Sequence, residues 1–278
     1  MALPERPVVL VTGASTGIGR AVALRFAADG ARLVLCARTA QNLEEVRALC
    51  VRAGAEVEVV PTDVVDATRV DDAVRRATER FGHLDVVVSV AGVTSYGSHT
   101  DTPAATFDRV VAVNLLGAAN LARSSLPVLA AQGGGTMVVV GSLLDRVAVP
   151  TMGAYVASKW GLRGLTRSLQ QESRSLPGVR VTAVTPGSVR TGIYTRAASS
   201  SGRTGSPPPP STSPERVARV VHRAAVRPRR GRDVDALGGL GNVGLRAASV
   251  LAPTVFDAAV GPLVRLLGTT GVTDDGPR

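Results

Sequence analysis

The segment YVASK places a tyrosine and a lysine four residues apart, and these two side chains are well suited to proton chemistry. Lys159 is the only lysine of the chain, among 32 Lys and Arg residues, and Tyr155 is one of three tyrosines. Residues i and i+4 share a face of a helix, so the phenol and the ammonium would lie together. A phenol has a pKa of about 10. A nearby compact ammonium favours the phenolate and would bring that pKa toward the range useful to a general acid or base.

Two polar residues elsewhere in the chain fit the same chemistry. Ser142 closes the apolar run TMVVVGS, and Asn114 interrupts the apolar helical stretch AVNLLG. Ligands of open α/β sheets bind at the carboxyl ends of the strands, where the Ser142 hydroxyl would steady a carbonyl oxygen beside Tyr155. Asn114 would bond the backbone or hold a water. Each residue alone has an ordinary structural explanation, but together they favour proton chemistry at a carbonyl oxygen.

A glycine-rich turn, VTGASTGIG at 11–19, follows the first predicted strand and opens the first predicted helix. Glycine permits a sharp turn and a close approach of backbone to phosphate. The helix N-terminus adds unpaired N–H groups and a partial positive charge. We therefore expect Gly13, Gly17 and Gly19 to hold the pyrophosphate of a dinucleotide, although their spacing differs from GxGxxG.

The end of the second predicted strand distinguishes the two nicotinamide cofactors. An acid there binds the ribose of NAD, whereas an arginine accommodates the 2′-phosphate of NADP. This strand ends Cys36-Ala37-Arg38 and has no acid. A guanidinium binds phosphate through two hydrogen bonds. NADP(H) is favoured over NAD(H), the alternative being that Arg38 only solvates the strand end.

Apolar strands alternate with amphipathic helices along most of the chain. Runs that are apolar without alternation are typical of parallel strands covered on both faces. The predicted fold is an α/β doubly wound parallel sheet, a Rossmann fold, in a single domain with a helical C-terminal extension. The predicted strands are 7–13, 32–38, 56–64, 84–92, 136–142 and 179–187, and the helices between them include 41–54, 66–81, 104–131 and 155–176.

The alternation of apolar strands with amphipathic helices stops after residue 192. We predict an NADP-binding Rossmann domain with the catalytic residues at 1–192, a flexible Pro/Ser-rich substrate loop at 193–214, and a helical extension packed on the same domain at 215–278. Within the extension, Ser213 is placed to cap a helix, the segment DVDAL suggests a short strand, and 245–268 suggests apolar helices broken at Pro253 and Pro262.

Composition limits the other functions. The 278 residues are 45% hydrophobic and only 3% aromatic, with a net charge of +10. Much of the excess charge lies in Arg216–Arg232, which lacks interleaved aromatics, so we expect a solvated basic face and no nucleic-acid binding. Three roles stay open for the tail: together with this arginine run it could contact a membrane surface, or it could form a lid over the pocket or a dimer contact.

The N-terminus does not resemble a signal peptide, and Cys36 and Cys50 do not form a disulfide framework. We therefore expect a cytoplasmic protein, and we predict no metal.

Residues 7–192 resemble the short-chain dehydrogenase/reductase family. TGASTGIG resembles its TGxxxGxG, Asp63-Val64 its adenine-contacting pair, and Pro186-Gly187 with Thr191 its PGxVxT segment. Asn114, Ser142, Tyr155 and Lys159 match its catalytic tetrad. The family's NNAG is here Ser89-Val90-Ala91-Gly92, without the asparagines. The resemblance and the turn together suggest these cofactor-binding residues: Gly13, Ser15, Thr16, Gly17, Ile18, Gly19, Arg38, Asp63, Val64, Ala91, Gly92, Tyr155, Lys159, Pro186, Gly187 and Thr191.

The resemblance implies hydride transfer between nicotinamide and a carbonyl or secondary alcohol. Tyr155 would be the acid/base, Lys159 would hold the ribose and lower the pKa of the tyrosine, Ser142 would steady the substrate oxygen, and Asn114 would support a water relay. It also implies a homo-oligomer, a dimer or tetramer, and the long tail is similar to that of members that act on lipophilic substrates. The expected function is an NADP(H)-dependent carbonyl reductase. The alternative is a non-catalytic NADP(H)-binding sensor or scaffold, which would not need an activated phenol.

Overall fold

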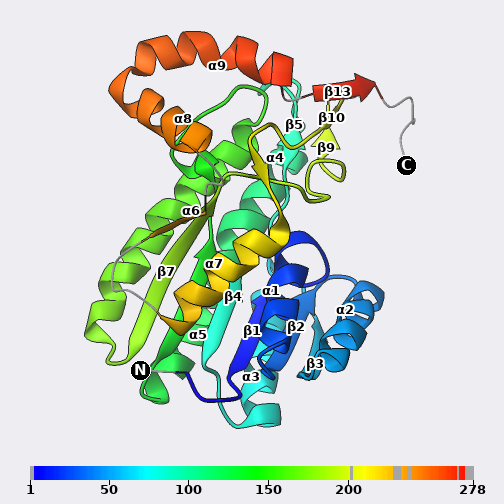
Figure 1. Ribbon diagram of the computed structural model, residues 1–278, viewed down its shortest axis with the longest axis vertical. Helices are drawn as coiled ribbons and strands as arrows, with labels where there is room; N and C mark the ends of the chain where they lie inside the picture. The colour runs from blue at the N-terminus through cyan, green and yellow to red at the C-terminus, as the bar shows by residue number, and fades with distance from the viewer. Residues whose placement is uncertain (1–2, 201–202, 228–232, 237–239, 268, 273–278) are drawn as a thin grey trace.

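The computed structural model describes residues 3–200, 203–227, 233–236, 240–267 and 269–272 (Figure 1). Within them, seven strands form one central sheet in the order β12-β7-β6-β4-β1-β2-β3, and every neighbouring pair runs parallel. The strands are β1 Val8–Thr12, β2 Arg32–Ala37, β3 Glu56–Pro61, β4 Val86–Ser89, β6 Gly135–Val140, β7 Val179–Pro186 and β12 Val234–Ala236. The predicted doubly wound parallel sheet is confirmed, and its seventh strand lies in DVDAL.

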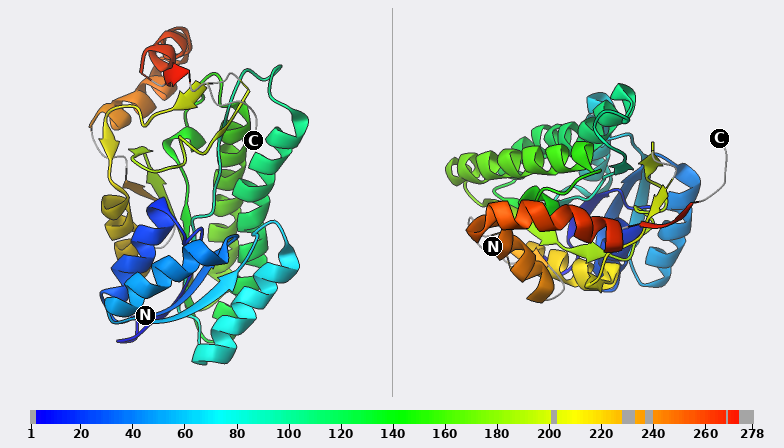
Figure 2. Two further views of the ribbon diagram at one scale, coloured as in Figure 1. Left: turned by 90° about the vertical axis from the view of Figure 1, so that its right-hand side faces the viewer. Right: turned by 90° about the horizontal axis from the view of Figure 1, so that it is seen from above.

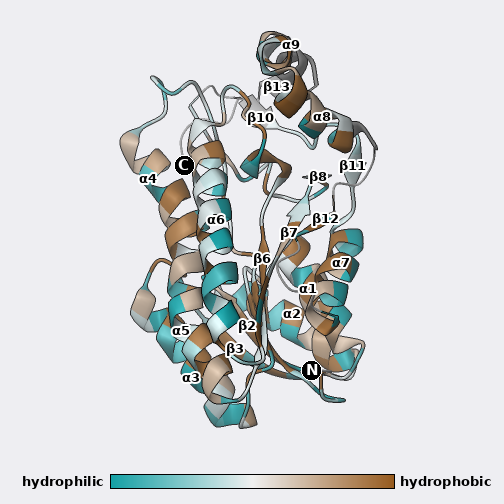
Figure 3. Cartoon of the chain, turned by 90° about the vertical axis from the view of Figure 1, so that its left-hand side faces the viewer, coloured by the Kyte–Doolittle hydropathy of each residue, from teal (hydrophilic) through white to brown (hydrophobic). Residues whose placement is uncertain are grey.

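Helices cover both faces of the sheet, which explains why the strands are apolar throughout. Along β1, Val9 and Val11 belong to the core on one face, whereas Val8 and Leu10 belong to the core on the other. Figures 2 and 3 show the resulting layers. The first core contains side chains of α1 Gly17–Ala27, α2 Ala40–Arg52 and α7 Pro214–Val226; the second contains those of α3 Ala67–Phe81, α5 Gly117–Ala131 and α6 Gly153–Glu172.

The chain beyond the Pro/Ser-rich segment contributes to this main fold. Val217 and Val221 of α7 are buried in the first core, and β12 pairs with β7. The predicted cap of α7 is confirmed, because the Ser213 hydroxyl oxygen accepts a hydrogen bond from the backbone N of Arg216 at 3.3 Å.

The helix expected over 104–131 is interrupted. It consists of α4 Ala104–Val111, a π-helical turn at Ala112–Leu116, and α5. The turn contains Asn114, whose side-chain amide bonds the backbone of the segment after β4. Amphipathic periodicity does not reveal a one-residue insertion of this kind, and such π turns are frequent at functional sites.

The Pro/Ser-rich segment is more regular than the sequence suggests. In its described part, two-residue strands pair with segments that follow β4 and β7. These short pairings lie within the predicted substrate loop at 193–214, and its flexibility stays a prediction. The pairs are β5 Ser95–Tyr96 with β9 Ala198–Ser199, and β8 Ser188–Val189 with β11 Ser211–Thr212; β10 Arg203–Gly205 pairs with β13 Thr269–Val272.

Two helices, α8 Leu240–Leu251 and α9 Pro253–Leu267, lie over the carboxyl ends of the strands (Figures 1 and 2). The predicted break at Pro253 is confirmed, but Pro262 lies inside α9, so the second predicted break is wrong. α7 Pro214–Val226 ends toward the end of the molecule opposite to α8 and α9 (Figure 1). The rest of the arginine run, 228–232, lies outside the described residues. No helix in the described part of the chain has the length and apolarity that crossing a bilayer requires.

Candidate active site

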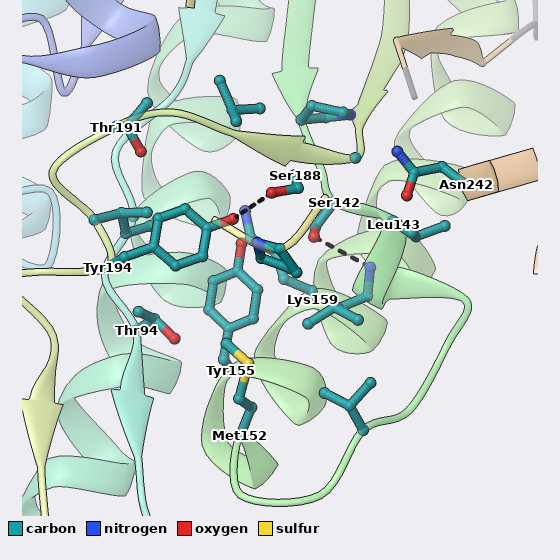
Figure 4. A pocket seen from close by; sticks show the side chains of 18 of the residues that line it. Thr94, Ser142, Leu143, Met152, Tyr155, Lys159, Ser188, Thr191, Tyr194 and Asn242 are labelled. Atoms are coloured by element: carbon teal, nitrogen blue, oxygen red, sulfur yellow. Dashed lines mark hydrogen bonds between the residues drawn. The ribbon is translucent and has the colours of Figure 1, made fainter. Parts of the chain in front are cut away.

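Tyr155 and Lys159 lie together at the carboxyl edge of the sheet (Figure 4). Both belong to α6, and the Lys159 Nζ lies 5.7 Å from the centroid of the Tyr155 ring. Lys159 is 5% exposed and donates a hydrogen bond to the Val140 carbonyl oxygen at 3.1 Å. The predicted shared face is confirmed, and the ammonium is fixed at the end of β6.

Burial shifts the pKa values of both groups. It lowers the pKa of Lys159 to about 8, and the negative charge of Asp145 opposes part of this shift. Burial also raises the pKa of Tyr155 above its ordinary value, while a hydrogen bond with Ser142 opposes that shift. The net shift of the Tyr155 pKa is therefore upward for the protein's own groups, and the lowering of this pKa by Lys159 stays a prediction. Desolvation disfavours the phenolate more strongly than the hydrogen bond with Ser142 favours it, and the charges of Tyr194 and Asp145 add to the upward shift.

Ser142 is positioned by a short turn that follows β6. Its hydroxyl oxygen accepts a hydrogen bond from the backbone N of Leu144 at 3.1 Å and so caps the 3₁₀ turn Leu143–Asp145. The Asp145 carboxylate accepts from the backbone N of Ser142 at 3.4 Å, although this carboxylate is only 3% exposed. These bonds hold the serine in extended backbone beside Tyr155.

Asn114 lies beneath the site. Its Oδ1 accepts from the backbone N of Val93 at 2.8 Å, and its Nδ2 donates to the Val93 carbonyl at 2.9 Å and to the Ser158 hydroxyl at 2.9 Å. The side chain is 1% exposed. Unlike the other three residues of the predicted tetrad, Asn114 does not line the cavities described below.

A cavity of about 390 Å³, which we call the tyrosine cavity, contains Tyr155 and Lys159 in its wall. Ser142, Pro186, Gly187 and Thr191, all predicted for the site, line it too. Lys159 is the only charged residue among the described lining. Sequence reasoning missed the following lining residues: Thr94, Tyr96, Met152, Ser188, Tyr194, Asn242, Leu245 and Val260.

A second cavity of about 400 Å³, the glycine cavity, adjoins the first and shares Gly92 and Thr191 with it. Gly13 and Gly17 have φ of +66° and +54°, and a Cβ on Gly13 would come within 2.8 Å of the Ala91 Cα. Gly13 therefore packs directly against the backbone of Ala91, and the glycines leave no side chain between the helix N-terminus and a bound pyrophosphate. Predicted residues on this lining are Gly13, Ser15, Thr16, Gly17, Ile18, Gly19, Arg38, Asp63, Val64, Ala91, Gly92 and Thr191.

Three arginines and one acid give the glycine cavity its charge. Arg38 lines it as expected, together with Arg109 and Arg196, which sequence reasoning missed. Arg109 donates to the Asp63 carboxylate at 2.8 Å, and Arg196 donates to the Thr16 hydroxyl at 2.9 Å. Burial raises the pKa of Asp63, but the hydrogen bond from Arg109 and the nearby positive charges outweigh it, so the net shift is downward. In a chain this rich in arginine, no local signal distinguishes Arg196 from the others.

The segment that departs from the family's NNAG pattern is held by other residues. The Thr12 hydroxyl oxygen accepts from the backbone N of Val90 at 3.1 Å and of Ala91 at 3.4 Å. Asn114 holds the next turn through Val93. Side chains on β1 and the π turn therefore position the cavity wall that the missing asparagines would otherwise hold.

Comparison with known proteins adds to this geometry. The model of the short chain dehydrogenase family matches residues 7–201. Glycine betaine reductase ATRR of Emericella nidulans is 36% identical over 195 residues, which cover 69% of this chain but only 15% of that protein. Levodione reductase of Leifsonia aquatica is 36% identical over 187 residues, 66% of this chain and 70% of that protein. The structure of an alcohol dehydrogenase from Thermococcus sibiricus, complexed with 5-hydroxy-NADP, is similar with a TM-score of 0.71 and 31% identity, covering 83% of this chain and 94% of that one.

Proposed function

Because the chain belongs to the short-chain dehydrogenase/reductase family, whose members are oxidoreductases that bind a nicotinamide cofactor, we propose that it is an NADP(H)-dependent reductase of uncharged carbonyl compounds. The observation that carries the proposal is that three residues of the predicted tetrad line one cavity, the tyrosine cavity. Ser142, Tyr155 and Lys159 line it together, and it adjoins a second cavity built on the glycine turn. The non-catalytic alternative has no comparable support, because a binding protein does not need these three groups on one lining.

In this proposal Tyr155 is the general acid. Since burial raises its pKa, the phenol carries its proton at neutral pH, which is the state that reduction requires. The Ser142 hydroxyl donates a hydrogen bond to the carbonyl oxygen, and Tyr155 gives that oxygen its proton. When bound, the reduced nicotinamide supplies the hydride to the carbonyl carbon. The Lys159 ammonium then stabilises the phenolate left behind.

Asn114 takes part as a positioning residue. Its amide holds the cavity wall through Val93 and contacts Ser158. A water relay that reprotonates Tyr155 would therefore depend on Asn114 through the backbone it fixes. Its side chain lies outside both linings.

The glycine cavity fits the rest of the cofactor. The turn from Gly13 to Gly19 would hold the pyrophosphate, and Asp63 and Val64 would border the adenine. Arg38 would pair with the 2′-phosphate, and the similar structure from Thermococcus sibiricus contains a modified NADP. A phosphate brings nearly two negative charges, and the lining provides three arginines against one carboxylate.

The tyrosine cavity favours a lipophilic substrate. Apart from Lys159 its described lining is uncharged, and its roof includes Leu245 of α8 and Val260 of α9. Burying a charge without a partner is costly, so an anionic substrate would bind poorly beside these residues. Val260 also packs with Phe256 and Leu143 in a small hydrophobic cluster. We assign α8 and α9 the role of a roof over the substrate, in preference to a membrane contact.

The proposal is tested by titrating the protein with NADPH and NADH while following nicotinamide fluorescence. We expect NADPH to bind about ten- to a hundredfold more tightly, the worth of one or two charge-assisted hydrogen bonds. Arg38→Asp should remove or reverse that preference. Arg52→Asp is the matched control, because Arg52 is exposed at the end of α2 and does not line the glycine cavity. Equal affinity for both cofactors in the wild type would contradict the NADP assignment, and tight NADPH binding with no reduction of any ketone would favour the sensor.

A further inference from the structure

All three tyrosines of this chain line the same cavity. Aromatic residues make up only 3% of the sequence, yet Tyr96, Tyr155 and Tyr194 come from three separate segments and meet in the tyrosine cavity. Tyr155 is explained by the proposed acid chemistry. Tyr96 is 8% exposed and packs against the backbone of Gly205, where a Cβ would collide with its ring and hydroxyl, so it is a wall residue. Tyr194 has neither explanation.

The Tyr194 hydroxyl points into the reactive part of the cavity. Figure 4 shows it beside the Tyr155 hydroxyl, and it lies 3.4 Å from the Ser188 hydroxyl. Ser188 is held in β8, which pairs with β11. Tyr194 follows the predicted cofactor residue Thr191 by three positions. The pair formed by Tyr194 and Ser188 therefore places two hydroxyl groups next to the proposed acid.

The reacting oxygen does not provide a partner for this pair. A carbonyl oxygen has two lone pairs, and in the proposed reaction Ser142 and Tyr155 donate to both. Within the pair of Tyr194 and Ser188, one O–H donates to the oxygen of the other. When a substrate closes the cavity, the second O–H either finds another acceptor or loses its hydrogen bond to water. A buried hydroxyl without a partner costs about 1–3 kcal/mol. The geometry therefore favours a second oxygen atom on the substrate, close to the first.

We propose that Tyr194, supported by Ser188, forms a second oxygen-binding subsite, and that the substrate is an apolar ketone with another oxygen on the adjacent carbon, as in a 1,2-diketone or an α-hydroxyketone. The apolar body of the substrate lies under Leu245 and Val260. This subsite rests on the proposed function, because it takes the reacting oxygen to lie between Ser142 and Tyr155. The reaction is unchanged: hydride adds to one carbonyl carbon, Tyr155 protonates its oxygen, and Tyr194 only binds the other oxygen.

The test compares 1-phenyl-1,2-propanedione with propiophenone, which lacks the second oxygen, at saturating NADPH. The wild type should prefer the dione by about ten- to a hundredfold in kcat/KM, since a site built to bind an oxygen rejects the analogue without it. Tyr194→Phe should remove most of that preference, mainly through a higher KM for the dione, and change kcat/KM for propiophenone less than about threefold. Thr195→Val is the matched control: it removes a hydroxyl from the neighbouring residue, which is exposed and lines neither cavity.

A second readout does not require turnover. Calorimetry of the dione with the NADP⁺-bound protein should show about tenfold weaker binding in Tyr194→Phe, with the affinity for NADP⁺ unchanged. Equal losses on both substrates, a weakened affinity for NADP⁺, or no preference for the dione in the wild type would each overturn the subsite. If the protein reduces neither compound, the proposed function fails, and the calorimetric difference between wild type and Tyr194→Phe still decides the subsite.

Discussion

At the scale of single residues, Lys159 shows why one lysine persists among so many arginines. Its ammonium is 5% exposed and is held by the Val140 carbonyl beneath the Tyr155 ring. A lysine ammonium is a compact point charge on a flexible stem, whereas a guanidinium is planar and broad. The slot under the ring and against the end of β6 suits the smaller group. The spacing in YVASK predicts the shared face, but not the burial that lowers the pKa of the lysine.

The pH dependence of the wild type follows from this burial. The pKa of Lys159 is about 8 in the folded protein against 10.5 ordinarily. The ammonium that stabilises the phenolate is therefore lost above about pH 8, and kcat should fall there. Between these two pKa values the unfolded chain binds more protons than the folded one, so the contribution of Lys159 to stability rises with pH over the same range. Paired kcat and urea-unfolding profiles from pH 7 to 10 check both slopes.

Lys159→Arg separates this titration from other alkaline effects. A guanidinium stays charged across the range, so the fall in kcat above pH 8 should disappear. The maximal kcat should drop at least about tenfold, because the planar group misplaces Tyr155. A variant that keeps the alkaline limb would mean that another group causes it.

At the scale of elements, the strands and the glycine turn follow from local patterns, whereas the π turn does not. Apolar runs of five or six residues and helical periodicity each depend on near neighbours in the sequence, so they are readable along the chain. The π turn at Ala112–Leu116 depends on Val93, which lies 21 residues from Asn114 in sequence. A polar residue within an apolar stretch was the only local sign of it.

Replacing Asn114 tests whether its hydrogen bonds with Val93 stabilise the π turn. Asn114→Leu leaves both the N–H and the C=O of Val93 without their partner in a partly buried position, and we expect a loss of about 2–4 kcal/mol in the free energy of unfolding. Asn120→Ala is the matched control on α5, the helix that continues from this turn. The Asn120 amide donates to the carbonyls of Val64 and Val65, and its oxygen accepts from the exposed Arg123; the substitution should cost about 1 kcal/mol. Urea denaturation measures both. A smaller loss for Asn114→Leu than for Asn120→Ala would contradict the role given to the π turn.

At the scale of the whole molecule, two exposed apolar side chains lie on elements that contact each other, the π turn and α6. Leu116 is 50% exposed, and Trp160, the only tryptophan of the chain, is 48% exposed. Aromatic residues are enriched at protein interfaces and often carry much of the binding energy. We expect the surface around these side chains to join two copies of the chain.

Trp160→Glu tests that interface. The substitution buries a charge against the partner copy, and we expect the dimer dissociation constant to rise at least about tenfold, as measured by sedimentation velocity. In the wild type, Trp160 fluorescence should shift to shorter wavelength as concentration rises. Val51→Glu is the control, because Val51 is a similarly exposed apolar residue on α2 (47%). A wild type that stays monomeric at high concentration, or an equal effect of both variants, would rule out this face.

Some features of this protein could be predicted from its sequence, whereas others are decided only by its tertiary structure. The parallel sheet, the glycine turn and the pairing of Tyr155 with Lys159 were predictable, because each is encoded within one short segment by glycine, by apolar runs or by i, i+4 spacing. The sequence predicts a substrate loop at 193–214, but not that Tyr194 and Arg196 of this loop and Leu245 and Val260 of the tail lie on the two cavities. These residues come from segments with weak local patterns, and only the crossing of the chain over the carboxyl ends of the strands brings them to the site. The proposed chemistry was therefore predictable locally, whereas the proposed choice of substrate depends on packing between distant segments.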